Sequence, residues 1–141
     1  MRKDRGFSLL ELLIVVAIIL IIATFAIPSL LRSRQVANEA GAVVNLKTLN
    51  AAEVTYMTSN TGAFGTIEQL VAAGMLDERF STSLGGYAYV VTPSGIGNTS
   101  YVSEATRLSE NTGRFNYYSG PDLIVRYRGT TGGVTADEPV Q

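Results

Sequence analysis

The chain has 141 residues and a formal net charge of −1, and it contains no cysteine and no histidine. Without these two residue types, disulfides, cysteine or histidine zinc sites, thiol nucleophiles and a Ser-His-Asp triad are all excluded. Lysine occurs only at Lys3 and Lys47, so a Ser-Lys mechanism has little to work with. The composition therefore argues against an enzyme, and it predicts neither a cofactor nor a metal site.

The first predicted element is a long apolar segment near the N-terminus. From Leu9 to Ile27 the only polar side chains are Glu11 and Thr24. At about 1.5 Å per residue this segment forms a helix of roughly 28 Å, long enough to cross the hydrocarbon core of a bilayer. A carboxylate inside lipid costs about 2.5–3.5 kcal/mol, and the segment contains no lysine or arginine. We therefore expect Glu11 to take a cation from outside its own segment.

The residues before this segment form a recognisable processing motif. The stretch from Met1 to Arg5 is short and basic, and Gly6, Phe7 and then Glu11, four residues after Phe7, follow it. Here the sequence resembles the prepilin family, the subunits of type IV pili and of the pseudopilus of type II secretion. The resemblance implies that a prepilin peptidase cuts between Gly6 and Phe7 and N-methylates the new amine of Phe7. That amine would then pair with Glu11 of a neighbouring subunit.

The charges around the apolar segment predict its orientation. Three of the first six residues are basic, which favours a cytoplasmic N-terminus, although Arg32 and Arg34 flank the other end. Together with the apolar segment this predicts a single-pass protein, and the resemblance to prepilins implies that the precursor lies in the bacterial inner membrane. Removal of three basic residues and one acidic residue with the leader leaves eight basic and eleven acidic side chains, a net charge of −3. A chain with this net charge does not predict the extended basic surface that binds nucleic-acid phosphates.

The N-terminal segment also admits two alternatives, a secretory signal peptide and a simple membrane anchor. An ordinary signal peptide has a short apolar core and a small-x-small cleavage site, whereas this core is long and residues 23–26 (ATFA) fit such a site poorly. A simple membrane anchor accounts for the length of the segment but leaves Glu11 without a partner.

Pro28 lies at the outer end of the apolar segment. Proline removes a backbone donor and clashes with the preceding turn, so we expect a kink or a locally loosened helix between Thr24 and Pro28. The resemblance implies bending or melting of the helix here in the filament, which makes Pro28 an assembly residue together with Phe7 and Glu11. A plain break at the membrane exit predicts the same local weakness.

Helical periodicity resumes at Ser29 and continues to about Asn60, so that a helix from Phe7 to Asn60 would be roughly 80 Å long. Its outer half carries two apolar strips. The first comprises Val36, Ala40, Val43, Val44, Ala51 and Val54, and the second comprises Leu49 and Tyr56 with Ala42 and Ala52 nearby. We expect one strip to pack on the head of the same chain and the other to contact neighbouring subunits.

The remainder of the chain predicts a short helix and a sheet. Gly62 suits the C-terminal cap of the long helix, and a capping box at residues 66–69 (TIEQ) opens a short helix that Gly74 stops. Four strands are predicted at residues 87–92, 100–107, 114–118 and 123–128. The expected fold class is therefore α+β, with a long N-terminal helix packed on a four-stranded antiparallel sheet, which is also the architecture of the pilin family. The expected organisation is a leader (1–6), a transmembrane and filament-core helix (7–28) and a globular head (29–141).

A group of arginines is a candidate site for nucleic acid. Arg126 and Arg128 share a strand face, and Arg107 and Arg114 are expected nearby. Such a cluster could contact DNA phosphates, but a solvated face or pairing with acids is the more common arrangement, so nucleic-acid binding is not favoured.

The acids near the C-terminus, Asp122, Asp137 and Glu138, lie in the region where major secretion pseudopilins hold a calcium ion. A calcium loop needs several oxygen ligands at close, regular spacing, and nothing in the sequence resembles one.

Aromatic residues on the helix, Phe7, Phe25 and Tyr56, are too sparse for electron transport within one subunit.

The sequence thus predicts a structural subunit that polymerises into a type IV pilus-like filament. The partners implied by the resemblance are prepilin peptidase, an assembly platform protein, a cytoplasmic assembly ATPase and many copies of the same chain. The alternatives are a type II secretion pseudopilin, which forms a short periplasmic piston, and a monomeric membrane-anchored binding domain.

Overall fold

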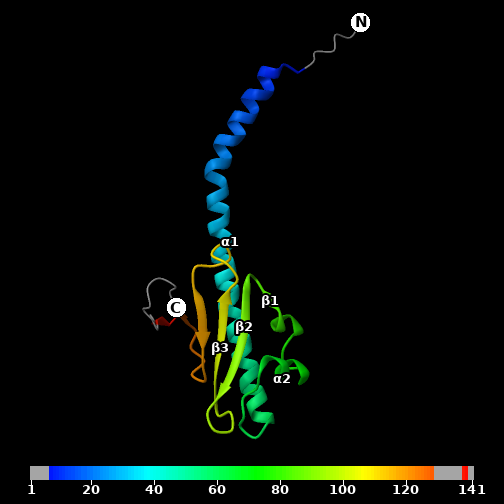
Figure 1. Ribbon diagram of the computed structural model, residues 1–141, viewed down its shortest axis with the longest axis vertical. Coiled ribbons are helices and arrows are strands. Elements are labelled where there is room, and N and C mark those ends of the chain that lie inside the picture. Colours follow the sequence, from blue (N-terminus) through cyan, green and yellow to red (C-terminus); the bar gives the residue numbers. More distant parts are fainter. Residues whose placement is uncertain (1–6, 129–137, 140–141) are drawn as a thin grey trace. The chain divides into compact units, whose positions relative to one another are not determined.

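The structure is a computed structural model that describes residues 7–128 and the backbone of residues 138 and 139. The helices are α1 (Leu9–Ser59), α2 (Ile67–Ala72) and the 3-10 helix η1 (Glu78–Ser81). The strands are β1 (Ser83–Leu84), β2 (Tyr87–Ser94), β3 (Ser100–Arg107), β4 (Asn116–Ser119), β5 (Arg126–Arg128) and β6 (Glu138–Pro139) (Figure 1). The long N-terminal helix followed by an antiparallel sheet confirms the predicted α+β class.

The chain divides into two compact units, Met1–Ser33 and Arg34–Gln141, and α1 contributes to both. We call the second unit the head. In the first unit, no described side chain is buried, although most of them are large and apolar. By length and composition α1 could cross a membrane, and it is the only helix in the described part of the chain that could.

The helix continues through Pro28 without a break. Proline has no N–H to donate, so the Thr24 carbonyl lacks its usual helical donor. The nearby Thr24 hydroxyl donates to the Leu20 carbonyl at 2.8 Å, a contact that often accompanies a slight bend. Pro28 therefore removes one helical hydrogen bond but does not end the helix. Bending or melting in an assembled state stays a prediction.

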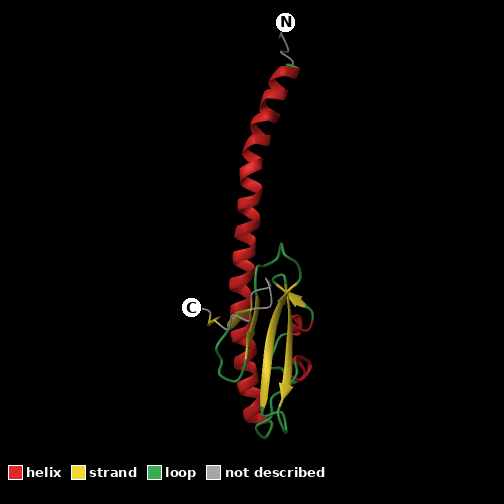
Figure 2. Ribbon diagram, turned by 60° about the vertical axis from the view of Figure 1, so that its left-hand side comes forward, coloured by secondary structure: helices red, strands yellow, loops and turns green. Residues whose placement is uncertain are grey.

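In the head, the C-terminal half of α1 packs on one face of the sheet (Figure 2). The described strands follow one another in the order β1 to β6, and each neighbouring pair is antiparallel. The longest pairing joins β2 and β3 over eight residues, from Tyr87↔Arg107 to Ser94↔Ser100. Alternate side chains of these two strands are buried against the helix, which is the period that an antiparallel sheet with one wet face requires.

Leucines of the helices and aromatics of the sheet fill the core of the head. Leu46 and Leu49 of α1 are fully buried, as are Tyr87 and Tyr101 of the sheet. Phe64 lies against Tyr101 with ring centroids 4.6 Å apart in a tilted arrangement, a geometry that adds to burial itself.

All four predicted strands form, but the sheet among the described residues has six strands, so the predicted count was wrong. The two unpredicted strands, β1 and β6, have two residues each and are too short to show periodicity. β1 turns into β2 through Gly85 and Gly86, which both have positive φ, as a two-residue hairpin loop requires.

Three predicted strands have different bounds in the structure: β2 ends at Ser94 rather than Thr92, and the last two strands begin later than predicted. The last one begins at Arg126 rather than Leu123, because Leu123 has a φ of 61° and cannot lie in an extended strand. β4 begins at Asn116 rather than Arg114, because the backbone N–H of Arg114 binds a carboxylate of α1 instead of a neighbouring strand.

The predicted caps are confirmed. Thr66 and Gln69 form a reciprocal capping box at the start of α2. Gly62 has a φ of 88°, and its N–H donates to the Met57 carbonyl at 3.0 Å, which closes the end of α1.

The two apolar strips of α1 are both present. The buried side includes Ala42, Leu46, Leu49 and Ala52. The other side stays exposed in the single chain and consists of Val36, Ala40, Val44, Ala51 and Val54; we call it the exposed strip. Val43, predicted to belong with it, is half-buried and packs on the core, because it lies at the edge of the arc. Contact of the exposed strip with neighbouring subunits stays a prediction.

Candidate functional site

Two of the predicted processing and assembly residues, Phe7 and Glu11, lie around the start of α1, whereas Pro28 lies inside the helix. Gly6 is outside the described residues. Phe7 is 84% exposed, and α1 begins two residues later. The Glu11 carboxylate accepts a hydrogen bond from the Ser8 backbone N–H at 2.9 Å, and the Ser8 hydroxyl accepts one from the Leu10 N–H at 3.3 Å. Glu11 thus faces the N-terminal end of its own helix.

This arrangement is a helix cap that sequence reasoning missed, although the signal was present. Residues 8–11 read Ser-Leu-Leu-Glu, the spacing of a capping box. A carboxylate in the first turn also interacts favourably with the positive end of the helix dipole. Glu11 therefore has a neutral donor within its own chain, but no ion pair with another described residue neutralises its charge.

Phe7 and Glu11 are close in sequence but form no ion pair in the uncleaved chain. While Gly6 is attached, the Phe7 nitrogen is an uncharged amide. Cleavage would turn it into an amine one residue before the Ser8 N–H that Glu11 already binds. Cleavage would thus create the predicted cation near Glu11 of the same chain, and this amine could also pair with Glu11 of a neighbouring copy.

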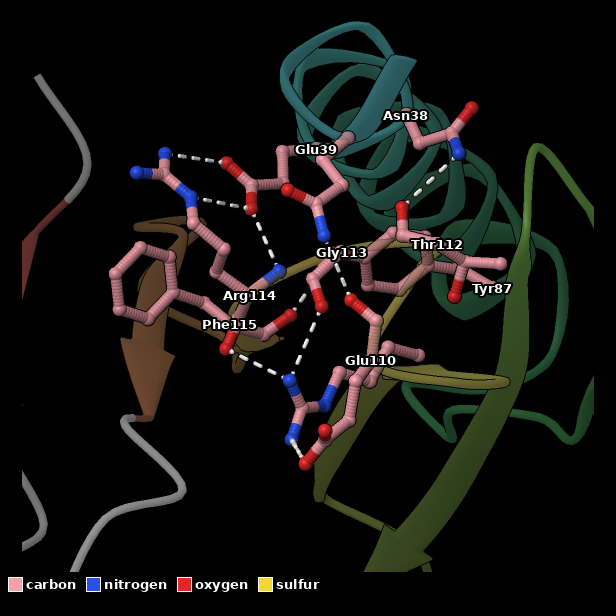
Figure 3. Close-up of polar contacts among 10 residues, drawn as sticks. Asn38, Glu39, Tyr87, Glu110, Thr112, Gly113, Arg114 and Phe115 are labelled. Carbon is pink, nitrogen blue, oxygen red and sulfur yellow. Dashed lines mark hydrogen bonds and ion pairs between the residues drawn. The ribbon is translucent and has the colours of Figure 1, made fainter. Parts of the chain in front are cut away.

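A second polar site fixes the loop between β3 and β4 to α1. Figure 3 shows Arg114 turned toward Glu39: its Nε and Nη2 donate to the carboxylate at 3.1 and 2.9 Å, and its backbone N–H donates at 2.7 Å. Glu39 is 6% exposed. Burial favours a higher pKa for Glu39, but the hydrogen bonds and charge of Arg114 outweigh burial and lower that pKa.

Two further side chains of α1 bind the same loop. The Asn38 amide donates to the Thr112 carbonyl at 2.9 Å (Figure 3), and the Gln35 amide donates to the Glu110 carbonyl at 2.7 Å. Residues at these spacings share one side of a helix, so three side chains hold the loop along α1. We call this set of contacts the loop clamp.

The loop held by the loop clamp has no room for a larger residue at Gly113. A Cβ built there would overlap the hydroxyl of Tyr87. That hydroxyl donates to the Phe115 carbonyl at 2.9 Å, and Arg107 donates to the carbonyls of Gly113 and Arg114 at 3.1 and 3.2 Å. Glycine is therefore required at Gly113 by close approach.

The arginines considered for nucleic-acid binding are all engaged within the chain. Arg126 pairs with Asp122 at 2.7 Å, and Arg128 pairs with Glu104 at 3.8 Å and lies over the ring of Tyr118. Arg114 is held by Glu39, and Arg107 by the loop carbonyls with Glu110 at 4.0 Å. These contacts support the interpretation that the arginines pair with acids rather than form a free basic patch.

The acids compared with a calcium site do not assemble either, as far as the structure describes them. Asp122 binds Arg126 and accepts from the Ile124 N–H at 3.2 Å. Asp137 and the side chain of Glu138 lie outside the described residues. No group of three or more potential metal-ligating side chains occurs among those that are described.

The core contains a polar network that has no local sequence signal. Asn50 of α1 donates to the Ser119 hydroxyl at 2.8 Å and accepts from Tyr101 and Ser103, both at 3.1 Å. These residues are fully or nearly fully buried, and their bonds connect the helix with β3 and β4. A satisfied buried network of this kind favours one register of helix and sheet.

Glu53, one turn further along α1, is fully buried. One carboxylate oxygen accepts from the Gly65 N–H at 3.0 Å, and the other has no hydrogen-bond partner among the described residues. Burial raises the pKa of Glu53, and the bond from Gly65 offsets only part of this effect.

Comparison with known proteins agrees with the N-terminal motif. Residues 1–27 match the family profile described as "Prokaryotic N-terminal methylation motif". The chain is 36% identical over 75 residues to the type IV wide pilus major component PilA4 of Thermus thermophilus, which covers 53% of this chain and 57% of that protein.

Two further relatives match shorter segments. Type II secretion system core protein G of Vibrio cholerae is 39% identical over 61 residues (43% of this chain, 42% of that protein). Type IV major pilin protein PilA of Myxococcus xanthus is 41% identical over 56 residues (40% of this chain, 26% of that protein). The chain therefore spans less than two thirds of the length of each relative. The methylation motif of residues 1–27 and these similarities support a relationship of the chain to type IV pilins and to a type II secretion core protein.

Proposed function

We propose that the chain is a structural subunit that polymerises into a type IV pilus-like filament after cleavage between Gly6 and Phe7 and methylation of the Phe7 amine. The observation that carries the proposal is the methylation motif of residues 1–27, which includes the apolar start of α1, where no described side chain is buried. The partners are prepilin peptidase, an assembly platform protein with its ATPase, and other copies of the chain. The proposed role is non-catalytic.

The exposed apolar side chains of the first unit support a role in two successive environments. Large apolar residues such as Leu13, Ile18 and Phe25 are 52–76% exposed. A contiguous apolar surface of this size has to be covered by lipid or by protein. We assign lipid of the inner membrane before assembly, with the N-terminus in the cytoplasm, and other subunits in an extracellular filament afterwards.

Glu11 gives this apolar surface a preferred register. In a dry filament core, its carboxylate is stable only beside a cation, because desolvation costs several kcal/mol per ion. The new amine of Phe7 supplies that cation in a neighbour shifted along the filament axis. The cap formed with Ser8 holds the carboxylate at the start of the helix, where such an amine would arrive.

Electron microscopy of filaments sheared from cells, combined with peptide identification, tests the proposal. Abundant long fibres composed of this chain, with subunits that start at a methylated Phe7, are expected. Cells that carry the processed chain but no fibres would contradict a pilus role.

A second candidate function is that of a pseudopilin in type II secretion. The similarity to core protein G of Vibrio cholerae favours it. The same microscopy separates the two functions, since a pseudopilin would give no long surface fibres and its deletion would instead abolish secretion of an exported protein.

A further inference from the structure

Ion pairs within the chain satisfy most charged side chains of the head. The described pairs are Arg79–Asp77, Arg107–Glu110, Arg114–Glu39, Arg126–Asp122 and Arg128–Glu104. Among the described residues of the head, two cations have no acidic partner, Arg34 and Lys47, and both lie on α1. Two exposed acids have no basic partner, Glu68 and Glu78, and they lie on α2 and η1.

Lys47 lies in the middle of the exposed strip. At 100° per residue, Lys47 and the five residues of the strip fall within an arc of about 80° around α1. Val44 and Val54, which flank it, are 60% and 38% exposed. In the single chain the ammonium group is solvated. If a protein surface covers the strip, Lys47 loses that water and requires an acid from the covering surface.

Glu78 is the acid best suited to this role. Glu68 already takes part in the first turn of α2, where Thr66 forms a hydrogen bond with it. Glu78 is exposed at the first position of η1, and no hydrogen bond or ion pair of its side chain is found in the described part of the chain. Lys47 and Glu78 form no pair with each other in one chain, so each is available to a second copy.

We propose that the exposed strip of one subunit docks on the α2–η1 edge of a second copy of this chain, with Lys47 of the first subunit paired to Glu78 of the second. The inference rests on the proposed function and deepens it by naming a contact between heads. The two surfaces differ, so the interface is heterologous and repeats from copy to copy. Such an interface does not end at a two-fold dimer, and it produces an open helical filament when the rotation between copies does not close into a ring.

The charge pair would set the register of this contact. An apolar strip of valines and alanines slides at little cost, whereas a lysine within it is compatible only with positions that bring an acid to it. Lys47 would thus select one stagger of neighbouring heads.

Zero-length carbodiimide cross-linking of purified filaments tests the proposal directly. After loss of residues 1–6, Lys47 is the only lysine of the chain, so any lysine cross-link identifies its partner. Filaments assembled from a mixture of ¹⁴N- and ¹⁵N-labelled subunits should give Lys47–Glu78 peptides that contain one light and one heavy half. Lys47→Arg is the matched control: it keeps the charge, so filaments should form while the cross-link disappears.

Charge exchange provides the second measurement. Lys47→Glu and Glu78→Lys should each lower filament yield by about tenfold or more, and the double variant should restore it. Cross-links of Lys47 to a different acid, cross-links only within one chain, or normal filaments from Lys47→Glu would overturn the inference. Absence of filaments from the unmodified chain would instead contradict the proposed function itself.

Discussion

The carboxylate of Glu39 on α1 receives three hydrogen bonds from Arg114, a residue 75 positions later in the chain. One of these bonds comes from the backbone, so the contact fixes the path of the loop as well as a side chain. Through it the loop between β3 and β4 is tied to the helix as well as to the sheet, and β4 starts two residues later than its sequence predicts.

Glu39→Gln should therefore destabilise the head. The amide cannot accept all three bonds, and the solvent exposure of Arg114 limits the loss to about 1–2 kcal/mol. Because the folded pKa of Glu39 is lowered from 4.5, its contribution is present above that pH and is lost as the pH falls through the folded value. Urea unfolding at pH 7 and pH 3 measures this, and the difference between wild type and variant should shrink at pH 3. Glu104→Gln, at the more exposed pair with Arg128, is the control and should change stability by less than about 0.5 kcal/mol.

Glu53 should give the opposite pH dependence. Its folded pKa is raised, so its contribution is complete below 4.5 and is lost as the pH rises through the folded value. Each unit by which the folded pKa exceeds 4.5 corresponds to about 1.4 kcal/mol. Relative to wild type, Glu53→Gln should therefore gain stability as the pH rises from 4.5 to 8. Unfolding at a series of pH values checks the prediction, and a constant difference between the two proteins would contradict it.

A fragment that begins at Ser29 should fold as a soluble monomer. It lacks the apolar segment but keeps the helix–sheet core, including the fully buried Leu46, Leu49 and Tyr101. Size-exclusion chromatography and cooperative urea unfolding are the measurements. Obligate aggregation of the fragment would show that the head needs its neighbours in order to fold.

Processing should occur between Gly6 and Phe7. Mass spectrometry of the mature subunit should find an N-terminus at Phe7 with one added methyl group, in agreement with the methylation motif of residues 1–27. A bulkier residue at Gly6 should block cleavage, because its side chain would crowd the cleavage pocket of the peptidase. A mature N-terminus near Ala26 would support an ordinary signal peptide.

Substitutions of Glu11 separate its charge from its cap. Glu11→Val removes both. It should leave cleavage intact and ease membrane insertion by about 3 kcal/mol, because no charge enters the lipid. It should nevertheless sharply reduce filaments. Glu11→Gln still accepts a hydrogen bond from the Ser8 N–H, since glutamine also completes a capping box, but it carries no charge. If charge pairing drives assembly, Glu11→Gln should fail like Glu11→Val, and Glu11→Asp should be intermediate. Normal filaments from Glu11→Gln would assign Glu11 to capping alone.

Local features of the chain could be predicted from its sequence. The apolar segment, the capping box at Thr66, the cap at Gly62 and the β2–β3 hairpin depend on periodicity or on bonds between residues close in the chain. The processing motif is equally local, and so is the missed capping box of Ser8 and Glu11.

Tertiary structure alone decided the features that join distant segments. Asn50 meets Ser119, Glu39 meets Arg114, and Glu53 becomes buried only because the head closes around α1. Strands of two residues, such as β1 and β6, have too few side chains for a pattern and exist only where a neighbouring strand offers hydrogen bonds. The sequence also does not show that Lys47 and Glu78 are unpaired. In the structure, the other exposed acids of the described head pair with arginines, with the exception of Glu68. The physical reason is the same in each case. The residue type determines which bonds a side chain can form, but folding of the whole chain decides which distant residues come close enough to form them.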